Sequence, residues 1–174
     1  MILLAHPNIK ESQANKALVD AVSDMEGVAV FNLYELSQEI AFNVDEWSKI
    51  ISDASAVIYQ FPFYWMSAPS LLKKWQDEVF TFLSKTPAVA GKSLTVVTTT
   101  GSEYEAYRSG GRNRFTMDEL LRPYQVSAIH SGMSWQTPIV VYGMGTADAG
   151  KNIAEGANLY KQRVETVSYT HLRA

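Results

Sequence analysis

Three segments of this 174-residue chain carry side chains that could bind a ligand, and the first is AHPNIKESQAN. It places His6, Ser12 and Asn15 around the expected start of a helix. Free backbone N–H groups and the positive end of the dipole suit such a place to an anion, for example a phosphate. The alternative is that Ser12 only caps the helix and His6 is a satisfied polar residue. Spacing alone does not separate the two, although Asn15, one turn on, favours a ligand.

The second segment, QFPFYWMSAPS, combines prolines with aromatic residues. Pro62 and Pro69 hold the connection extended. Tyr64 and Trp65 then offer aromatic surface on which a flat conjugated ligand could stack. A packed aromatic corner is the alternative, and it is the better interpretation of three residues that fall on strand or helix faces, Phe61, Trp75 and Phe80.

The third segment, TTTGSEYEAYRSGGRN, is long, polar and rich in glycine. It begins with Thr99, Thr100 and Gly101 and runs through Tyr107 to Asn113. Loops of this length inside a compact domain are usually functional or mobile. Threonine at a strand end is also common for structural reasons, so this segment alone does not predict a site.

The elements that must position these segments are alternating strands and helices. Aliphatic or β-branched runs predict five strands, at 2–5, 28–33, 56–60, 93–100 and 138–143. Runs that are apolar on both faces, separated by helical patterns, indicate a parallel sheet covered on both sides, which is the three-layer α/β class. If the strand order is 2-1-3-4-5, the three segments follow neighbouring strands and converge on one crevice.

Helix boundaries are predicted from capping residues and helix breakers. Pro123 should kink or divide a helix over 116–131, and Gly132 should end it. The final VSYTHLRA does not extend the amphipathic pattern before it, so we expect one domain over 1–167 and a frayed or non-native tail over 168–174. The expected helix starts are Ser12, Asp45, Ser67 and a capping box of Thr116 with Glu119.

Composition excludes several classes of function. A formal net charge of −3 and a pI near 5.6 leave no basic footprint for a nucleic acid or an anionic membrane. The absence of cysteine excludes disulfides, cysteine-ligated zinc and a cysteine nucleophile, and we expect no metal site. The first segment has neither G-x-G-x-x-G nor G-K-[ST]. With no signal peptide or membrane span expected, we predict a cytoplasmic protein.

Several motifs occur together and in order. They are HP…S-x-x-N, P-x-Y-W-x-x-x-P-x-L-L-K-x-W-x-D-x-V-F, TTG…Y…N-R-F-x-M-x-x-L-L-R-P and G-M-x-W-x-x-P. This combination resembles the flavodoxin-like NAD(P)H:quinone oxidoreductases, in register over roughly residues 2–165. Within them it is most similar to the short bacterial branch that includes the ancillary subunits of glutathione-gated potassium efflux systems.

The resemblance implies a flavodoxin-like three-layer sandwich with five parallel strands in the order 2-1-3-4-5. It also implies a homodimer with a tightly bound flavin that reduces quinones by two electrons from NADPH or NADH. The short chain favours FMN over FAD. The residues that match family positions around the flavin phosphate are His6, Ser12 and Asn15. Those that match the segment along the isoalloxazine are Pro62, Phe63, Tyr64, Trp65 and Met66, and those that match the turn at its pyrimidine side are Thr99, Thr100 and Gly101.

The resemblance also implies catalytic positions. Tyr107 matches a tyrosine near the ring and the substrate, and it would donate a hydrogen bond to developing charge. Asn113 stands where some relatives carry a histidine, and because a neutral amide does no acid–base work it would only orient or polarise. Nicotinamide and acceptor would use one site in turn, which predicts ping-pong hydride transfer. The chain lacks a G-F-A-Y-G-type segment after Phe80, which weakens the quinone assignment more than the flavin assignment.

Two other functions are compatible with the same motifs. The chain could be a redox-sensing regulatory subunit that binds a potassium efflux antiporter, or a reductase whose small-molecule acceptor is a nitro or azo compound. A preference for NADPH would need a basic contact to the 2′-phosphate. The candidates for that contact are Arg108, Arg112 and Arg114.

Overall fold

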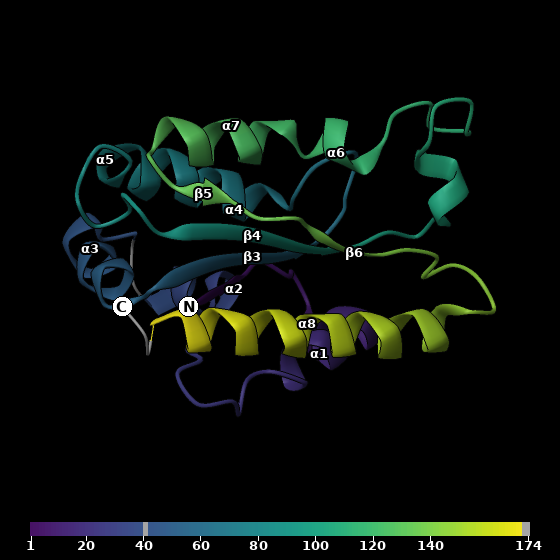
Figure 1. Ribbon diagram of the computed structural model, residues 1–174, viewed down its shortest axis with the longest axis horizontal. Helices are drawn as coiled ribbons and strands as arrows, with labels where there is room; N and C mark the ends of the chain where they lie inside the picture. The colour runs from purple at the N-terminus through teal and green to yellow at the C-terminus, as the bar shows by residue number, and fades with distance from the viewer. Residues whose placement is uncertain (40–41, 172–174) are drawn as a thin grey trace.

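A parallel sheet forms the centre of the computed structural model, which describes residues 1–39 and 42–171 (Figure 1). The strands run in the order β2-β1-β3-β4, and both β5 and β6 pair with the outer edge of β4. Their bounds are Ile2–Leu4 (β1), Val30–Asn32 (β2), Ala56–Pro62 (β3), Ser93–Thr99 (β4), Ser134–Trp135 (β5) and Ile139–Val141 (β6). The predicted α/β class and strand order are therefore confirmed, with one difference at the edge.

The fifth strand of the expected order is divided into two short pieces. β5 pairs with Ser93 and Leu94 at the start of β4, and β6 pairs with Val97 to Thr99 at its end. Pro138 lies between the two pieces, and a proline cannot donate a ladder hydrogen bond. The sequence pattern predicted only the second piece, because β5 has two residues and no strand periodicity.

Helices cover both faces of the sheet. α1 (Gln13–Asp20) and α8 (Ala149–His171) lie side by side on one face, below the sheet in Figure 1. The other face carries α2 (Leu33–Glu39), α3 (Val44–Asp53), α4 (Ser70–Trp75), the π-helix η2 (Gln76–Phe80), α5 (Thr81–Leu83), α6 (Met117–Leu120) and α7 (Arg122–His130). Two short 3₁₀ helices, η1 (Ile9–Glu11) and η3 (Tyr104–Tyr107), lie in loops that follow β1 and β4.

Strand residues alternate between two hydrophobic cores. Leu3, Val57 and Tyr59 face the larger core under α3, α4 and α7, which is rich in aromatic residues. Ile2 and Ile58 face the smaller core under α1 and α8. Because both faces of each strand are buried, the strands read as continuous apolar runs, as expected for a parallel sheet.

Several predicted helix boundaries are confirmed. Ser12 caps α1 by accepting from the backbone N–H of Asn15 at 3.1 Å. Thr116 and Glu119 form the expected capping box. The helix over 116–131 divides between Leu120 and Arg122, and Gly132, with a φ of 71°, follows its end.

Two helix starts were predicted wrongly. α3 is capped by Asn43, not Asp45, because the Asn43 side chain accepts from the backbone N–H groups of Asp45 and Glu46. α4 begins after Pro69, not after Ser67, with no side-chain cap. α8 extends through His171, into the tail expected over 168–174, and the last three residues of that tail lie outside the described residues. No helix among the described residues is long and apolar enough to cross a membrane.

Candidate functional site

A cavity of about 300 Å³ lies at the carboxyl ends of β1, β3 and β4, the place where ligands bind in open parallel sheets. All three segments singled out in the sequence contribute to it. Nine residues predicted to hold a cofactor line this cavity: His6, Ser12, Asn15, Pro62, Phe63, Tyr64, Thr99, Thr100 and Gly101. We call it the strand-end cavity.

The start of α1 forms one end of the strand-end cavity. Ser12 ends η1 and caps α1, and the first two helical residues, Gln13 and Ala14, line the cavity. Their backbone N–H groups have no acceptor within the helix. His6 is only 8% exposed, and its Nδ1 accepts a hydrogen bond from the backbone N–H of Asn8 at 3.1 Å. The proton of the neutral ring is therefore on Nε2, which can donate to a ligand. Burial lowers the pKa of His6 and keeps this neutral form.

Asn15 joins α1 to the sheet. Its Nδ2 donates to Thr99 Oγ1 at 2.9 Å, and its backbone carbonyl accepts from Gln60 Nε2 at 2.8 Å. Asn15 is 1% exposed, yet its side-chain oxygen has no hydrogen-bond partner among the described residues. A buried acceptor without a donor is costly, so a ligand hydroxyl in the adjacent cavity would stabilise it.

The threonines that end β4 each have a specific contact. Thr98 donates from its hydroxyl to the carbonyl of Phe61 at 2.8 Å, which ties β4 to β3. Thr99 receives the Asn15 amide, and Thr100 donates to the carbonyl of Ser102 at 2.7 Å. These contacts turn the chain sharply at Gly101, where an added Cβ would meet nothing within 4 Å. The wall of the cavity is therefore open at this residue.

The aromatic segment after β3 makes a tight turn at the rim. Tyr64 and Ser67 exchange two backbone hydrogen bonds of 2.8 and 3.0 Å around Trp65 and Met66. Both central residues have a left-handed backbone, with φ of 46° and 63°. Phe63 and Tyr64 line the cavity, whereas Trp65 points outward with 97% of its surface exposed and Met66 is 46% exposed. Unlike the other nine predicted residues, Trp65 and Met66 therefore do not line the strand-end cavity.

Sequence reasoning missed a fourth segment of the cavity wall. Met144, Ala149 and Ile153 line it from the loop after β6 and the first turns of α8. The backbone N–H of Met144 donates to the carbonyl of Thr100 at 2.9 Å, which holds this loop against the end of β4. The signal was present, because the strand order that groups the other loops also puts the end of the last strand at this edge.

The two predicted catalytic residues lie outside the strand-end cavity. Tyr107 is 6% exposed, and its ring meets that of Phe63 edge-on at 6.2 Å, so it stands behind the cavity wall. Asn113 lies where the loop folds back, and its backbone N–H donates to the carbonyl of Ala106 at 2.9 Å. The fold-back requires glycine at 111, because a Cβ there would lie 2.2 Å from the carbonyl oxygen of Glu105.

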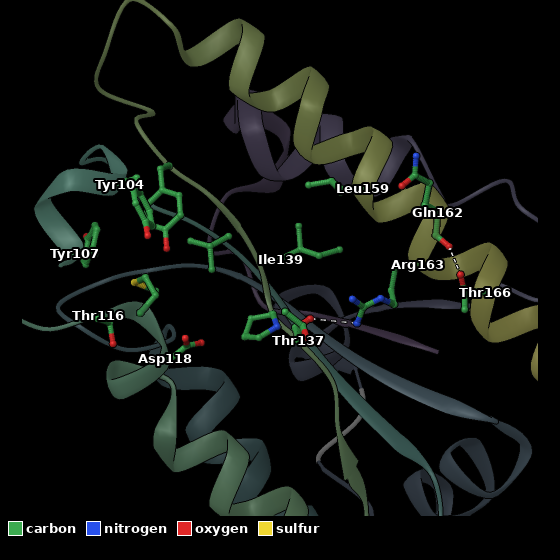
Figure 2. A pocket seen from close by; sticks show the side chains of 14 residues that line it. Tyr104, Tyr107, Thr116, Asp118, Thr137, Ile139, Leu159, Gln162, Arg163 and Thr166 are labelled. Carbon is green, nitrogen blue, oxygen red and sulfur yellow. Dashed lines mark hydrogen bonds between the residues drawn. The ribbon is translucent and has the colours of Figure 1, made fainter.

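Tyr107 lines a second and larger cavity of about 600 Å³ (Figure 2). Tyr104 and Tyr107 stand at one end of it, Arg163 on α8 stands at the other, and Ile139 of β6 lies between them. Arg163 donates to the carbonyl of Thr137 at 3.1 Å. Tyr142 also lines this cavity, and burial, with a smaller contribution from the nearby Tyr104, raises its pKa to about 12. Its hydroxyl therefore stays protonated.

The chain matches the family described as "Flavodoxin-like fold" over residues 1–164. It belongs to that family. Among the relatives of this chain, the uncharacterized NAD(P)H oxidoreductase YdeQ of Bacillus subtilis is 34% identical over 171 residues, which cover 96% of this chain and 86% of YdeQ. The glutathione-regulated potassium-efflux system ancillary protein KefG of Pectobacterium atrosepticum is 34% identical over 146 residues, 82% of this chain and 80% of KefG.

Two solved structures resemble the chain over nearly its whole length. General stress protein 14 of Treponema denticola, solved in complex with FMN, is 29% identical with a TM-score of 0.86, covering 95% of this chain and 97% of that one. The NADPH-quinone reductase of P. pentosaceus is 28% identical with a TM-score of 0.78, covering 91% and 95%. The resemblance to flavodoxin-like oxidoreductases, drawn above from motifs alone, is confirmed.

The residues of the strand-end cavity fit FMN in three respects. The unpartnered oxygen of Asn15 can accept from a hydroxyl of a ribityl chain. The start of α1 and His6 Nε2 offer donors to a phosphate. Phe63 and Tyr64 offer aromatic surface to a conjugated ring. The described residues that line the cavity include no lysine or arginine, so a phosphate would be held by neutral donors and the helix dipole.

Proposed function

We propose that the protein is a flavin-dependent oxidoreductase that takes two electrons from NAD(P)H and passes them to a quinone or a similar small acceptor. The observation that carries the proposal is the strand-end cavity, which is bordered by a helix start and aromatic side chains. It is lined by Asn15, whose buried side-chain oxygen has no hydrogen-bond partner among the described residues. Support comes from a relative of the same fold that is solved with FMN, and from relatives named as NAD(P)H oxidoreductase and quinone reductase.

The cofactor of this proposal is FMN. Bound FMN would supply hydride chemistry, which side chains alone do not provide. The role of the chain is to bind and orient: Ser12 and the start of α1 would receive the phosphate, Asn15 a ribityl hydroxyl, and the Thr99–Gly101 turn the polar edge of the ring. Phe63 and Tyr64 would border the ring and exclude water from it.

Tyr107 is the proposed donor to the substrate. Its position behind Phe63 and beside the larger cavity would let its hydroxyl reach charge that develops on an acceptor. If donor and acceptor bind in turn at one place, the kinetics are ping-pong. Asn113 would orient this loop through its backbone contact to Ala106.

For the choice between NADPH and NADH we propose Arg112 as the contact to a 2′-phosphate. Its guanidinium donates to Ser102 Oγ, one residue beyond the cavity wall at Gly101. Arg108 instead lies over the Tyr104 ring, 5.6 Å from its centroid. Arg114 has a left-handed backbone, with a φ of 62°, in the next turn.

The test is the absorption spectrum of the purified protein after incubation with FMN and removal of free FMN. We expect a retained flavin spectrum that bleaches on anaerobic addition of NADPH and returns with a quinone. Tyr107→Phe should lower kcat/KM for the quinone about tenfold and leave retention of FMN unchanged. Tyr160→Phe, which removes another buried tyrosine hydroxyl from a residue that lines neither cavity, is the matched control and should change neither. A protein that retains no flavin would contradict the proposal.

A second candidate function is regulation of a potassium efflux antiporter from the cytoplasmic side. It is favoured by the 34% identity to KefG, an ancillary protein of such a system. A flavin that binds tightly but is not reduced by either nicotinamide nucleotide would favour this role over turnover. In either case we propose a homodimer, because it would cover exposed aromatic side chains on the loops that follow β3 and β4, which are Trp65, Tyr104 and Phe115.

A further inference from the structure

The turn at the rim of the strand-end cavity is strained. Trp65 and Met66 occupy the two central positions of a two-residue turn with positive φ. Such a turn is normally built from glycine, asparagine or aspartate, because a larger residue in this conformation brings its Cβ against the following carbonyl. Two bulky residues in succession need a contact outside the turn that keeps them there.

Tyr124, in the first turn of α7, provides that contact. Its hydroxyl oxygen accepts from the backbone N–H of Ala68 at 3.1 Å and lies 3.3 Å from Ser67 Oγ. Ala68 and Ser67 are the residues at which the turn ends, 56 and 57 positions away in the chain. The turn is therefore tied at its exit by one side chain from another element.

The Tyr124 side chain is itself held firmly. It is 6% exposed, and its ring packs at 5.4 Å from the ring of Phe61 and edge-on at 6.4 Å from that of Tyr59. Both of these residues belong to β3, the strand that enters the turn. Tyr124 thus spans the turn from its entry strand to its exit, and its hydroxyl fixes the distance between them.

We infer that Tyr124 is a positioning residue for the proposed flavin site: its hydroxyl holds the left-handed Trp65–Met66 turn in place and thereby sets how tightly Phe63 and Tyr64 border the cofactor. The inference rests on the proposed function, since it assigns the ligand of the cavity as a flavin. It predicts that a change at Tyr124 alters the affinity and the midpoint potential of the flavin, although Tyr124 does not itself line the strand-end cavity.

The test compares Tyr124→Phe with Tyr160→Phe. The first change keeps the ring contacts and removes the anchoring hydroxyl, whereas the second removes a fully buried hydroxyl that has no partner among the described residues. We expect Tyr124→Phe to raise the dissociation constant of FMN about tenfold, because it leaves the Ala68 N–H unpaired, and to shift the flavin midpoint potential. Tyr160→Phe should change neither quantity. Equal FMN affinity and potential in Tyr124→Phe and wild type would overturn the inference.

Two further measurements keep the inference testable on its own. Hydrogen exchange at the Ala68 amide, measured without flavin, should be faster in Tyr124→Phe than in wild type, and unchanged exchange would overturn the anchor. If wild type binds no FMN, the proposed function fails while this exchange measurement still decides the anchor. Adding Ser67→Ala to Tyr124→Phe should weaken FMN binding no further, because the contact between Ser67 Oγ and the Tyr124 hydroxyl is already lost in Tyr124→Phe. Additive losses would contradict a shared anchor.

Discussion

The two ends of the strand-end cavity are built in different ways. At the start of α1, the contacts that form the turn into the helix are local: Ser12 accepts from the backbone N–H of Asn15, and His6 accepts from that of Asn8. Bonds from Asn15 to the sheet are added to this local cap. At the aromatic turn, the backbone of Trp65 and Met66 is strained, and the stabilising contact comes from Tyr124 on another helix. The turn at the first end is therefore capped by its own segment. The second depends on tertiary structure, so mutations there should act at a distance.

The largest effect is expected from Asn15→Asp at the α1 end. The change keeps the shape of the side chain but places a carboxylate at a position that is 1% exposed and lines the cavity next to the proposed phosphate site. Burial and repulsion should together raise the dissociation constant of FMN by about 100-fold or more. Titration of the apo-protein with FMN measures this.

Lys16→Gln is the control for Asn15→Asp. It lowers the net charge by the same one unit at the next residue, where the side chain is exposed and pairs with Asp20. We expect its FMN affinity to stay within about twofold of wild type. A similar loss in both variants would show that overall charge, and not the buried position, controls binding.

A smaller effect is expected from His6→Ala, in which a donor to the phosphate is lost. The dissociation constant of FMN should rise about tenfold while that of riboflavin, which has no phosphate, stays the same. Comparing the two titrations measures the phosphate contact alone. Equal losses for both ligands would mean that His6 supports the cavity and does not touch the phosphate.

The pH dependence of stability gives an independent check on His6. Burial lowers its pKa in the folded chain, whereas the unfolded chain keeps a value near 6.5. As the pH falls, the unfolded chain takes up the proton first, so the contribution to stability is full above about pH 6.5 and is lost below it. Urea unfolding at about pH 7.5 and about pH 5.5 should show a smaller loss in His6→Ala than in wild type.

The same contrast explains what could be predicted from the sequence. Ser12 as a cap and the convergence of three loops followed from local patterns and one topological rule, and the structure agrees with both. The outward Trp65 could not be predicted, because no glycine or asparagine marks a left-handed turn at 65–66. Nor could the bond from Tyr124 to Ala68, since a contact between distant positions leaves no periodic signal.

Other differences have equally specific causes. The loop with Met144 follows from the rule that located the other three, but strand β6 carries no polar residue at its end to draw attention to it. Tyr107 faces the larger cavity because the chain folds back at Gly111 onto η3, a close approach that depends on backbone geometry and not on residue spacing. Local chemistry therefore predicts the α1 end well and the aromatic end poorly.

A further, smaller effect is expected from Ser12→Ala, which removes the cap of α1. The lost hydrogen bond to the Asn15 N–H should lower the free energy of unfolding by about 1 kcal/mol. Urea unfolding of the apo-protein measures it, with Ser23→Ala on the same chain as a control outside the helix start. A change below about 0.3 kcal/mol would mean that the contacts of Asn15 to Thr99 and Gln60 hold the helix start without the cap.

The smallest effect, and one of opposite sign, is expected from Met66→Gly at the aromatic turn. Glycine adopts a φ of 63° without a Cβ clash, which relieves strain, although it also adds entropy to the unfolded chain. The net result should be a gain of about 0.5 kcal/mol in the free energy of unfolding, whereas Met66→Val, with a branched Cβ, should lose about 1–2 kcal/mol. Destabilisation by both changes would mean that the Met66 side chain, 46% exposed, contributes more packing than its backbone costs. If instead the glycine variant gains stability while its FMN affinity falls, the strain at the rim is retained for binding.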